Sequence, residues 1–428
     1  MSASEQGASA LPARSLLERF RRIREMSAVL CEPLSAEDMV VQAAAHASPA
    51  KWHLAHTTWF FETFVLERHE AAFSPFADEF RVLFNSYYKQ VGAQHPRPQR
   101  GVLTRPDVET VMAYRRAIDQ RVCELVESTD ECTRGAIGEL IELGLHHEQQ
   151  HQELLLMDVK LLLSMNPLAP AYRSGGGSSA PTRQARPARW VSFDGGMVEV
   201  GHSGEGFAYD NEEPRHRRFL EAFELSDRLV TNGEFAAFID DGGYERAELW
   251  LDAGWTCARA NGWSCPAYWR REGDAWLEYK LDGLGGLETE RPVCHLSFYE
   301  ANAFARWAEA RLPTEFEWER ACAGLEIEGN FVEQDHLHPV AAGEEPGIRQ
   351  AYGDVWEWTR SAYEPYPGYA SAPGAIGEYN GKFMCNQQVL RGGCCVTSRS
   401  HMRATYRNFF HPDDRWQFGG IRLARSMS

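Results

Sequence analysis

Three histidines fall within six positions of a strongly apolar stretch, GLHHEQQHQELLLMD at residues 144–158. His147 and His151 are four residues apart, so on an α-helix of about 3.6 residues per turn both side chains lie on one face. His146 points away from that face. Two imidazoles in this arrangement can bind one metal ion, although inward-facing histidines are also held in protein cores by hydrogen bonds alone. The spacing therefore predicts a metal site or a pair of hydrogen-bonded core histidines.

A second histidine-bearing segment, SPAKWHLAHTTWFFETF at residues 48–64, supplies a candidate third ligand. On a helix, His56 shares a stripe with Trp52, whereas His53 lies off that stripe. Three neutral imidazoles suit Zn(II) or a non-haem Fe(II), and three protein ligands leave positions open for water, substrate or dioxygen. The spacing alone does not choose between the two metals.

Helices must position these histidines. Four long stretches before about residue 165 have apolar residues at helical spacing, and the two histidine segments are the second and the fourth of them. This pattern predicts a four-helix bundle with the imidazoles facing its interior. The four stretches are approximately residues 14–31, 49–69, 107–128 and 134–163.

The second half of the chain has a different character. Residues 166–189 are rich in Pro, Gly, Ser and Arg, which is typical of a flexible linker. Beyond them, short apolar and aromatic runs alternate with glycine-containing turns, and helical patches such as residues 297–310 are few. We therefore predict an α+β multidomain chain with a loop-rich second domain. Its parts are a disordered N-terminus (1–14), a helical bundle (15–165), a linker (166–189) and the loop-rich domain (190–426).

Composition limits the classes of partner. The chain has 428 residues and a formal net charge of −17, which argues against a phosphate-binding surface for nucleic acids. No segment approaches the roughly 18 consecutive apolar residues of a membrane helix, and the N-terminus lacks the apolar stretch of a signal peptide. Ten irregularly spaced cysteines without a CxxC pair indicate reduced thiols. We expect a cytoplasmic protein that acts on small molecules, with no nucleic-acid or membrane partner.

Several motifs carry a family resemblance. KWHLAHTTWFFE and HHEQQHQE resemble the DinB-type helical domain of the ergothioneine-pathway sulfoxide synthases, and RLPTEFEWERA, GDVWEW and YRNFF resemble the formylglycine-generating-enzyme fold, a variant of the C-type lectin fold. The motifs extend over nearly the whole chain in this order. The resemblance implies a non-haem Fe(II) held by His56, His147 and His151. It also implies a dioxygen-dependent reaction that joins hercynine, which is trimethylated histidine, to cysteine as a sulfoxide.

The resemblance also implies contacts to hercynine. Gln150 stands where the glutamine of the family touches the substrate imidazole, and Asn408 and Phe409 stand in the segment that contacts hercynine. An aromatic face suits the permanent cation of hercynine. The alternative for Gln150 is an exposed helix glutamine, and the alternative for the aromatic residues is ordinary packing, which we prefer for Trp416.

Arg97 and Arg100 resemble the arginines that hold the carboxylate of the thiol substrate in this family. A planar guanidinium can bind a carboxylate through two hydrogen bonds, although solvated arginines in a proline-rich loop remain an alternative. Relatives that use γ-glutamylcysteine have an acidic residue where this chain has Phe410. Free cysteine is therefore the expected thiol.

Tyr87 and Tyr88 resemble the active-site tyrosines of one branch of the family, in which a phenol donates a proton to a reduced oxygen species and thereby diverts the reaction from cysteine sulfinate. Which of the two donates is open, and both could be packing residues. The fold also often holds a structural calcium ion near GDVWEW, where Asp354 replaces the usual asparagine. We treat a Ca²⁺ site as a hypothesis.

Three other functions remain open from the sequence. A related synthase could join histidine to cysteine, or hercynine to a selenosugar. A DinB-type, metal-dependent thiol transferase would work without dioxygen. A non-catalytic binding protein would use the histidines only structurally. The sequence does not indicate the oligomeric state.

Overall fold

The computed structural model describes residues 13–173 and 186–427. Almost all of the predicted disordered N-terminus (1–14) and the middle of the predicted linker (174–185) lie outside the described residues. The chain divides into two compact units between Val159 and Lys160. The predicted α+β class, with a helical bundle followed by a loop-rich domain, is confirmed.

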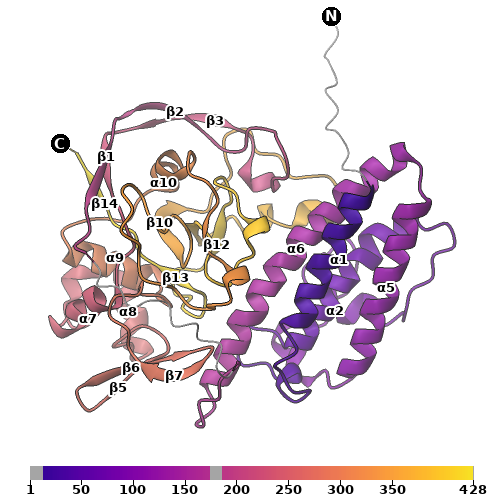
Figure 1. Ribbon diagram of the computed structural model, residues 1–428, viewed down its shortest axis with the longest axis horizontal. Helices are drawn as coiled ribbons and strands as arrows, with labels where there is room; N and C mark the ends of the chain where they lie inside the picture. Colours follow the sequence, from indigo (N-terminus) through magenta and orange to yellow (C-terminus); the bar gives the residue numbers. More distant parts are fainter. Residues whose placement is uncertain (1–12, 174–185, 428) are drawn as a thin grey trace, which may run out of the picture. The chain divides into compact units, whose positions relative to one another are not determined.

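Long helices build the first unit, and they lie alongside one another (Figure 1). α2 continues into a π-helix and a short last turn, which places the whole segment from residue 50 to residue 69 on one rod. α6 runs without a break through the division between the units, so the division falls inside a helix. The elements are α1 (Ala13–Val29), α2 (Ala50–Phe60), the π-helix η2 (Phe61–Leu66), α3 (Glu67–His69), α4 (Phe80–Leu83), the 3₁₀-helix η3 (Arg97–Val102), α5 (Val108–Ser128) and α6 (Glu131–Ser164).

A glycine allows α6 to approach the α2 segment closely, one turn before His147. A Cβ atom on Gly144 would lie 2.6 Å from Cε1 of Phe61 and 2.9 Å from Cε1 of Phe60, which is closer than carbon atoms can pack. Both phenylalanine rings are buried, and Phe61 meets Phe20 of α1 edge to face, with 5.1 Å between ring centroids. The glycine and these rings therefore fix the distance between the two histidine-bearing helices.

The second unit consists of short helices and small sheets. The largest sheet has the strand order β12-β11-β10-β13, and only β10 and β13 run parallel in it. Its helices are α7 (Asn232–Asp240), α8 (Asp252–Ala260), α9 (Phe298–Trp307) and α10 (Glu315–Cys322). Its strands are β1 (Trp190–Phe193), β2 (Gly196–Val200), β3 (His216–Leu220), β4 (Phe223–Ser226), β5 (Trp269–Glu272), β6 (Ala275–Lys280), β7 (Gly283–Gly286), β8 (Gly329–Asn330), β9 (Tyr352–Gly353), β10 (Trp356–Ala362), β11 (Gln388–Arg391), β12 (Asn408–Phe410), β13 (Gly419–Gly420) and β14 (Ala424–Ser426).

Local sequence signals start three of these helices. α7, α9 and α10 each begin with a capping box, in which a Ser or Thr hydroxyl accepts from the backbone N–H three residues later and a glutamate there accepts from the capping N–H. Such pairs satisfy the free N–H groups of a helix end and favour helices even as short as eight to ten residues. The pairs are Thr231 with Glu234, Ser297 with Glu300, and Thr314 with Glu317.

Buried arginines hold the loops of the second unit. Arg422 is fully buried and forms two hydrogen bonds with the carboxylate of Glu357, and its remaining N–H groups donate to backbone carbonyls of residues 226, 349 and 350. Arg407 also forms two hydrogen bonds with the carboxylate of one glutamate, Glu315.

The first part of the predicted linker is held against the second unit, because Tyr172 is buried and its N–H donates to the carbonyl of Leu281. Among the described residues, no helix is both long and apolar enough to span a membrane.

Candidate metal centre

The three histidines predicted as metal ligands come together in the first unit. One nitrogen from each of His56, His147 and His151 lies within 4.8 Å of the corresponding nitrogens of the other two. The ring centroids are 4.6 to 4.9 Å apart in all three pairs. His146 takes no part, because its Nε2 lies 2.9 Å from the guanidinium of Arg19 on α1. The i, i+4 pair on α6 and the single histidine of α2 thus face one common point.

All three imidazoles are in the neutral form that binds metals. Burial lowers the pKa of His147 to about 3 and holds the pKa of His56 and His151 well below 6.5. His56 donates its Nδ1 proton to the carbonyl oxygen of Phe84 at 2.6 Å, so Nε2 carries the lone pair, and it has no hydrogen-bond partner among the described residues. Three neutral nitrogen donors fit Fe(II) or Zn(II).

A fourth histidine orients His151. His53 Nε2 lies 3.0 Å from Oδ2 of Asp158, and a carboxylate can only accept, so His53 carries its proton on Nε2. His53 Nδ1 then accepts from His151 Nδ1 at 2.8 Å, which leaves Nε2 of His151 to face the metal position. Asp158 is fixed in turn by the backbone N–H of Ser48 at 2.8 Å. Sequence reasoning did not include His53, although Asp158 lies on the same face of α6 as His151, two helical turns further on.

Asp158→Asn is expected to weaken Fe(II) binding by about 10- to 100-fold, the usual effect of changing a group that orients a metal-binding histidine. The amide can donate to His53 Nε2 and so favour the wrong tautomer of both histidines. The dissociation constant of Fe(II) under anaerobic conditions is the measurement. Glu142→Gln, also on α6 but paired with Arg19, is the control and should bind Fe(II) like the parent protein. Equal affinity of the two variants would contradict the orienting role.

A buried ion cluster lies next to His147. Arg24 of α1 donates to Oε2 of Glu148 at 2.6 Å, while Arg115 of α5 and Ser27 donate to Oε1. Burial raises the pKa of Glu148, but the charges of Arg115 and Arg24 lower it by more, so that the pKa is about 2. Glu148 is therefore an anion that ties α1 and α5 to the histidine-bearing helix.

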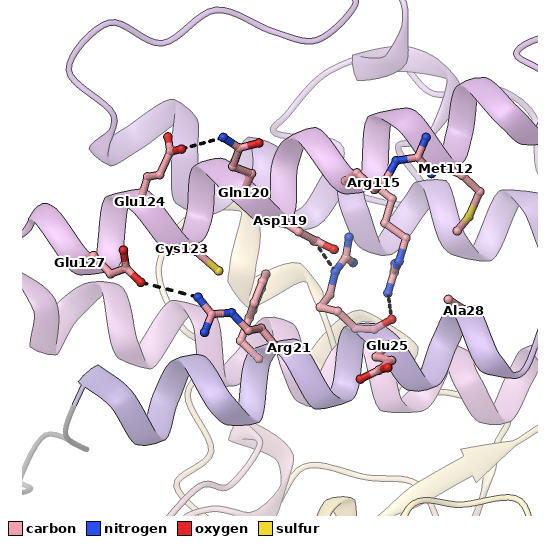
Figure 2. Close-up of a pocket in the computed structure, with 13 residues that line it drawn as sticks. Arg21, Glu25, Ala28, Met112, Arg115, Asp119, Gln120, Cys123, Glu124 and Glu127 are labelled. Atoms are coloured by element: carbon pink, nitrogen blue, oxygen red, sulfur yellow. Dashed lines mark hydrogen bonds and ion pairs between the residues drawn. The ribbon is translucent and has the colours of Figure 1, made fainter.

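A groove on the bundle surface opens over this cluster. Figure 2 shows residues that line the groove between α1 and α5, among them Arg115 and Asp119 of α5, with Arg21 paired with Glu127 near one end. The groove has a volume of about 580 Å³, and no histidine is among the residues that line it. It is therefore separate from the metal-ligand group.

Of the two predicted carboxylate-binding arginines, only Arg100 is buried, and Arg97 is exposed. The guanidinium carbon of Arg100 lies 3.3 Å from the ring centroid of Trp52, and that indole stacks on His56 with 4.6 Å between centroids. Its Nη atoms donate to the hydroxyls of Ser48 and Ser86, and Nε has no partner among the described residues. Burial, followed by the charge of Arg97, lowers the pKa of Arg100. A buried guanidinium with only hydroxyl partners favours an anionic ligand.

The predicted tyrosines stack on one another beside the same aromatic column. The rings of Tyr87 and Tyr88 are 4.7 Å apart; Tyr88 is buried and Tyr87 is half-buried. Tyr88 also lies 5.6 Å from the ring of Trp59, which stacks on His56. Gln150 is half-buried on α6, directly before His151. The ring of Trp59 thus lies between Tyr88 and His56.

The predicted hercynine contacts Asn408 and Phe409, and the predicted substrate-binding residue Phe410 beside them, form strand β12 of the second unit. All three side chains are half-buried. Phe409 stacks on Tyr363 with 4.0 Å between ring centroids, and Phe410 meets Trp416 at 5.3 Å. The role of these residues in binding hercynine stays a prediction.

The GDVWEW loop holds Asp354 in a dense hydrogen-bond arrangement. Its Oδ1 accepts from the side chain of Asn330 at 2.9 Å and from the backbone N–H of Val340 at 2.8 Å. Burial raises the pKa of Asp354 to about 6 in spite of these bonds. Because hydrogen-bond donors occupy Oδ1, this geometry adds no support for Ca²⁺, and the calcium hypothesis stays a prediction.

Known proteins match both halves of the chain. Residues 19–155 match the DinB superfamily, and residues 177–346 and 341–427 match the sulfatase-modifying factor enzyme 1-like domain. A hercynine oxygenase of Mycolicibacterium thermoresistibile is 32% identical over 88% of this chain and 87% of that protein. The hercynine oxygenase of Mycolicibacterium smegmatis is 30% identical over 88% and 91%, and that of Mycobacterium tuberculosis is 33% identical over 65% and 70%. With a DinB superfamily domain followed by a sulfatase-modifying factor enzyme 1-like domain, the chain belongs to the family of the hercynine oxygenases.

Proposed function

We propose that this chain is an oxygenase that uses Fe(II) and dioxygen to join hercynine to cysteine, giving hercynylcysteine sulfoxide in ergothioneine biosynthesis. The observation that carries the proposal is the group of three neutral imidazoles, from His56, His147 and His151, in a chain of the hercynine oxygenase family. Three protein nitrogens leave open positions on a metal ion, as a catalytic rather than a structural site requires.

The proposed reaction balances without a further reductant. Replacing a C–H and an S–H bond by a C–S bond removes two electrons, and converting the sulfur to a sulfoxide removes two more. Dioxygen accepts these four electrons, so one oxygen atom enters the sulfoxide and the other leaves as water. Iron(II), when bound, supplies the one-electron chemistry through which dioxygen reacts with two closed-shell substrates.

The residues of the chain bind and orient the substrates. We assign the carboxylate of cysteine to Arg100, because this buried guanidinium lies on the Trp52 ring beside His56 and has only hydroxyl partners. Arg97 adds positive charge at the exposed start of the same 3₁₀-helix. Gln150 is the proposed contact of the hercynine imidazole. Cysteine rather than γ-glutamylcysteine is the proposed thiol, since Phe410 offers no carboxylate for a glutamyl ammonium group.

Product analysis tests the reaction. The full chain loaded with Fe(II) is mixed with hercynine, cysteine and dioxygen, and product mass and oxygen uptake are measured together. We expect one coupled sulfoxide for each dioxygen consumed. Oxygen uptake that yields only cysteine sulfinate would reject this substrate pair, and parallel reactions with histidine or with a selenosugar would identify the other synthases. Thiol transfer without oxygen uptake would instead indicate a transferase.

One of Tyr87 and Tyr88 is proposed as the proton donor that directs the reaction to the sulfoxide. Replacing the donor by phenylalanine is expected to shift the ratio of coupled sulfoxide to cysteine sulfinate by at least about 100-fold, the lower range for general acid catalysis. The same replacement at the other tyrosine keeps the stacked ring pair and serves as its control. The ratio is measured by mass spectrometry of the products. If neither variant changes it, the tyrosines are packing residues.

A further inference from the structure

The second unit contains another buried group with metal-ligand chemistry. Ligand atoms of Glu278, Cys294 and His338 all lie within 4.8 Å of one another, and each residue is at most 3% exposed. Glu278 lies on β6, Cys294 follows β7, and His338 lies in the loop between β8 and β9. Three segments that are distant in sequence thus bring a carboxylate, a thiol and an imidazole to one point.

The buried imidazole of His338 makes few polar contacts. Its Nδ1 has no hydrogen-bond partner among the described residues, and its Nε2 faces Oε2 of Glu278 at 3.3 Å. Burial lowers the pKa of His338, which favours the neutral ring that can bind a metal ion. An unsatisfied buried polar group is costly, and a metal ion would satisfy the lone pair of this imidazole. The loop is already held in place, because the carbonyl of His338 accepts from the side chain of Asn330 at 2.8 Å.

A buried lysine is the main competitor for the charge of Glu278. Lys160 is fully buried, but its Nζ lies 2.7 Å from Nε2 of His295 and packs over the rings of Tyr268 and Phe418 at 4.9 and 4.7 Å. The lysine is therefore directed at an imidazole and two aromatic faces. The carboxylate of Glu278 and the thiolate of Cys294 would together neutralise a divalent ion.

We propose that Glu278, Cys294 and His338 bind a second metal ion, of the thiolate-binding class to which Zn(II) belongs. A sulfur, a nitrogen and an oxygen ligand suit this borderline-soft ion, whereas Ca²⁺ and Mg²⁺ prefer oxygen ligands alone. The ion would link strand β6 and two loops of a unit built from small sheets, and its role would be structural. This site is distinct from the histidine group of the first unit in both residues and ligand chemistry.

Cobalt(II) tests the proposal because a thiolate ligand produces an intense charge-transfer absorption that imidazole ligands do not. The metal-free full chain is titrated anaerobically with Co(II). We expect two bound equivalents, one of which shows the thiolate band. His147→Ala should lose one equivalent and keep the band. Cys294→Ser should lose the other equivalent together with the band, and Cys322→Ser, which replaces another fully buried thiol of the same unit, should keep both.

Two outcomes would overturn the proposal. A parent protein without the thiolate band would show that the cluster is metal-free. A band that survives Cys294→Ser would assign the thiolate to a different cysteine. If Cys294→Ser does not fold, His338→Gln replaces it, since this variant keeps the thiol and removes only the nitrogen ligand. It is expected to weaken Co(II) binding by at least tenfold.

Discussion

Replacing His147 by alanine is expected to abolish iron binding and to lower kcat/KM for oxygenation by at least about 100-fold. This exceeds the effect of changing a group that only orients a ligand, because one of three protein ligands is lost. The two remaining nitrogens, from His56 and His151, would hold the ion weakly, and no carboxylate is part of the described histidine group. Iron content after anaerobic loading and desalting, together with the rate of oxygen uptake, measures the loss.

His146→Ala is the matched control, because the two histidines are adjacent on α6 and both are buried. His146 contacts Arg19 rather than the other imidazoles, so its replacement should leave iron content unchanged. His147→Gln retains most of the side-chain volume beside Phe60 and separates lost ligation from a new cavity. Full iron content in both His147 variants would show that the metal is bound elsewhere. That result would also remove the main support for the proposed function.

The histidine group could be predicted because it depends on short-range periodicity. His147 and His151 are four residues apart on one long helix, and the helical period alone places them on one side. The same argument excluded His53, which lies off the stripe of His56 on α2. In the folded bundle its Nε2 lies 3.0 Å from Oδ2 of Asp158 on the neighbouring helix α6. Contacts of this kind depend on the distance between helices, which periodicity does not give.

For the second unit, the sequence predicted the class of fold but not which segments lie next to each other. Turn glycines and capping pairs indicate many short elements, but they do not show which loops meet. The cluster of Glu278, Cys294 and His338 has no spacing signal, since each residue comes from a different segment. The buried arginines are equally hidden, because arginine is usually an exposed residue and its partner carboxylates are distant in sequence. For example, Arg422 and Glu357 are separated by 65 positions.

Glu148→Gln is expected to destabilise the helical unit by about 3–5 kcal/mol, the usual cost of removing one partner of a buried ion pair. The substitution preserves size, so the effect reports charge rather than a cavity. It leaves the guanidinium groups of Arg24 and Arg115 buried without their shared carboxylate, and Asp119 pairs only with Arg24 among the described ion pairs. The measurement is the urea midpoint of the helical circular dichroism signal, because most of the long helices belong to this unit.

Glu142→Gln, on the same helix, is the control, because it removes a charge from an ion pair that is partly exposed. Its partner Arg19 is partly exposed, and ion pairs near the surface contribute roughly 0–1 kcal/mol, so the midpoint should hardly change. A cost at Glu148 no larger than that at Glu142 would mean that water reaches the cluster, through the groove that Arg24 and Arg115 line. A large cost would instead establish that Glu148 holds α1 and α5 against α6 one residue from His147. The rigidity of the metal centre would then depend on a charge that does not bind the metal.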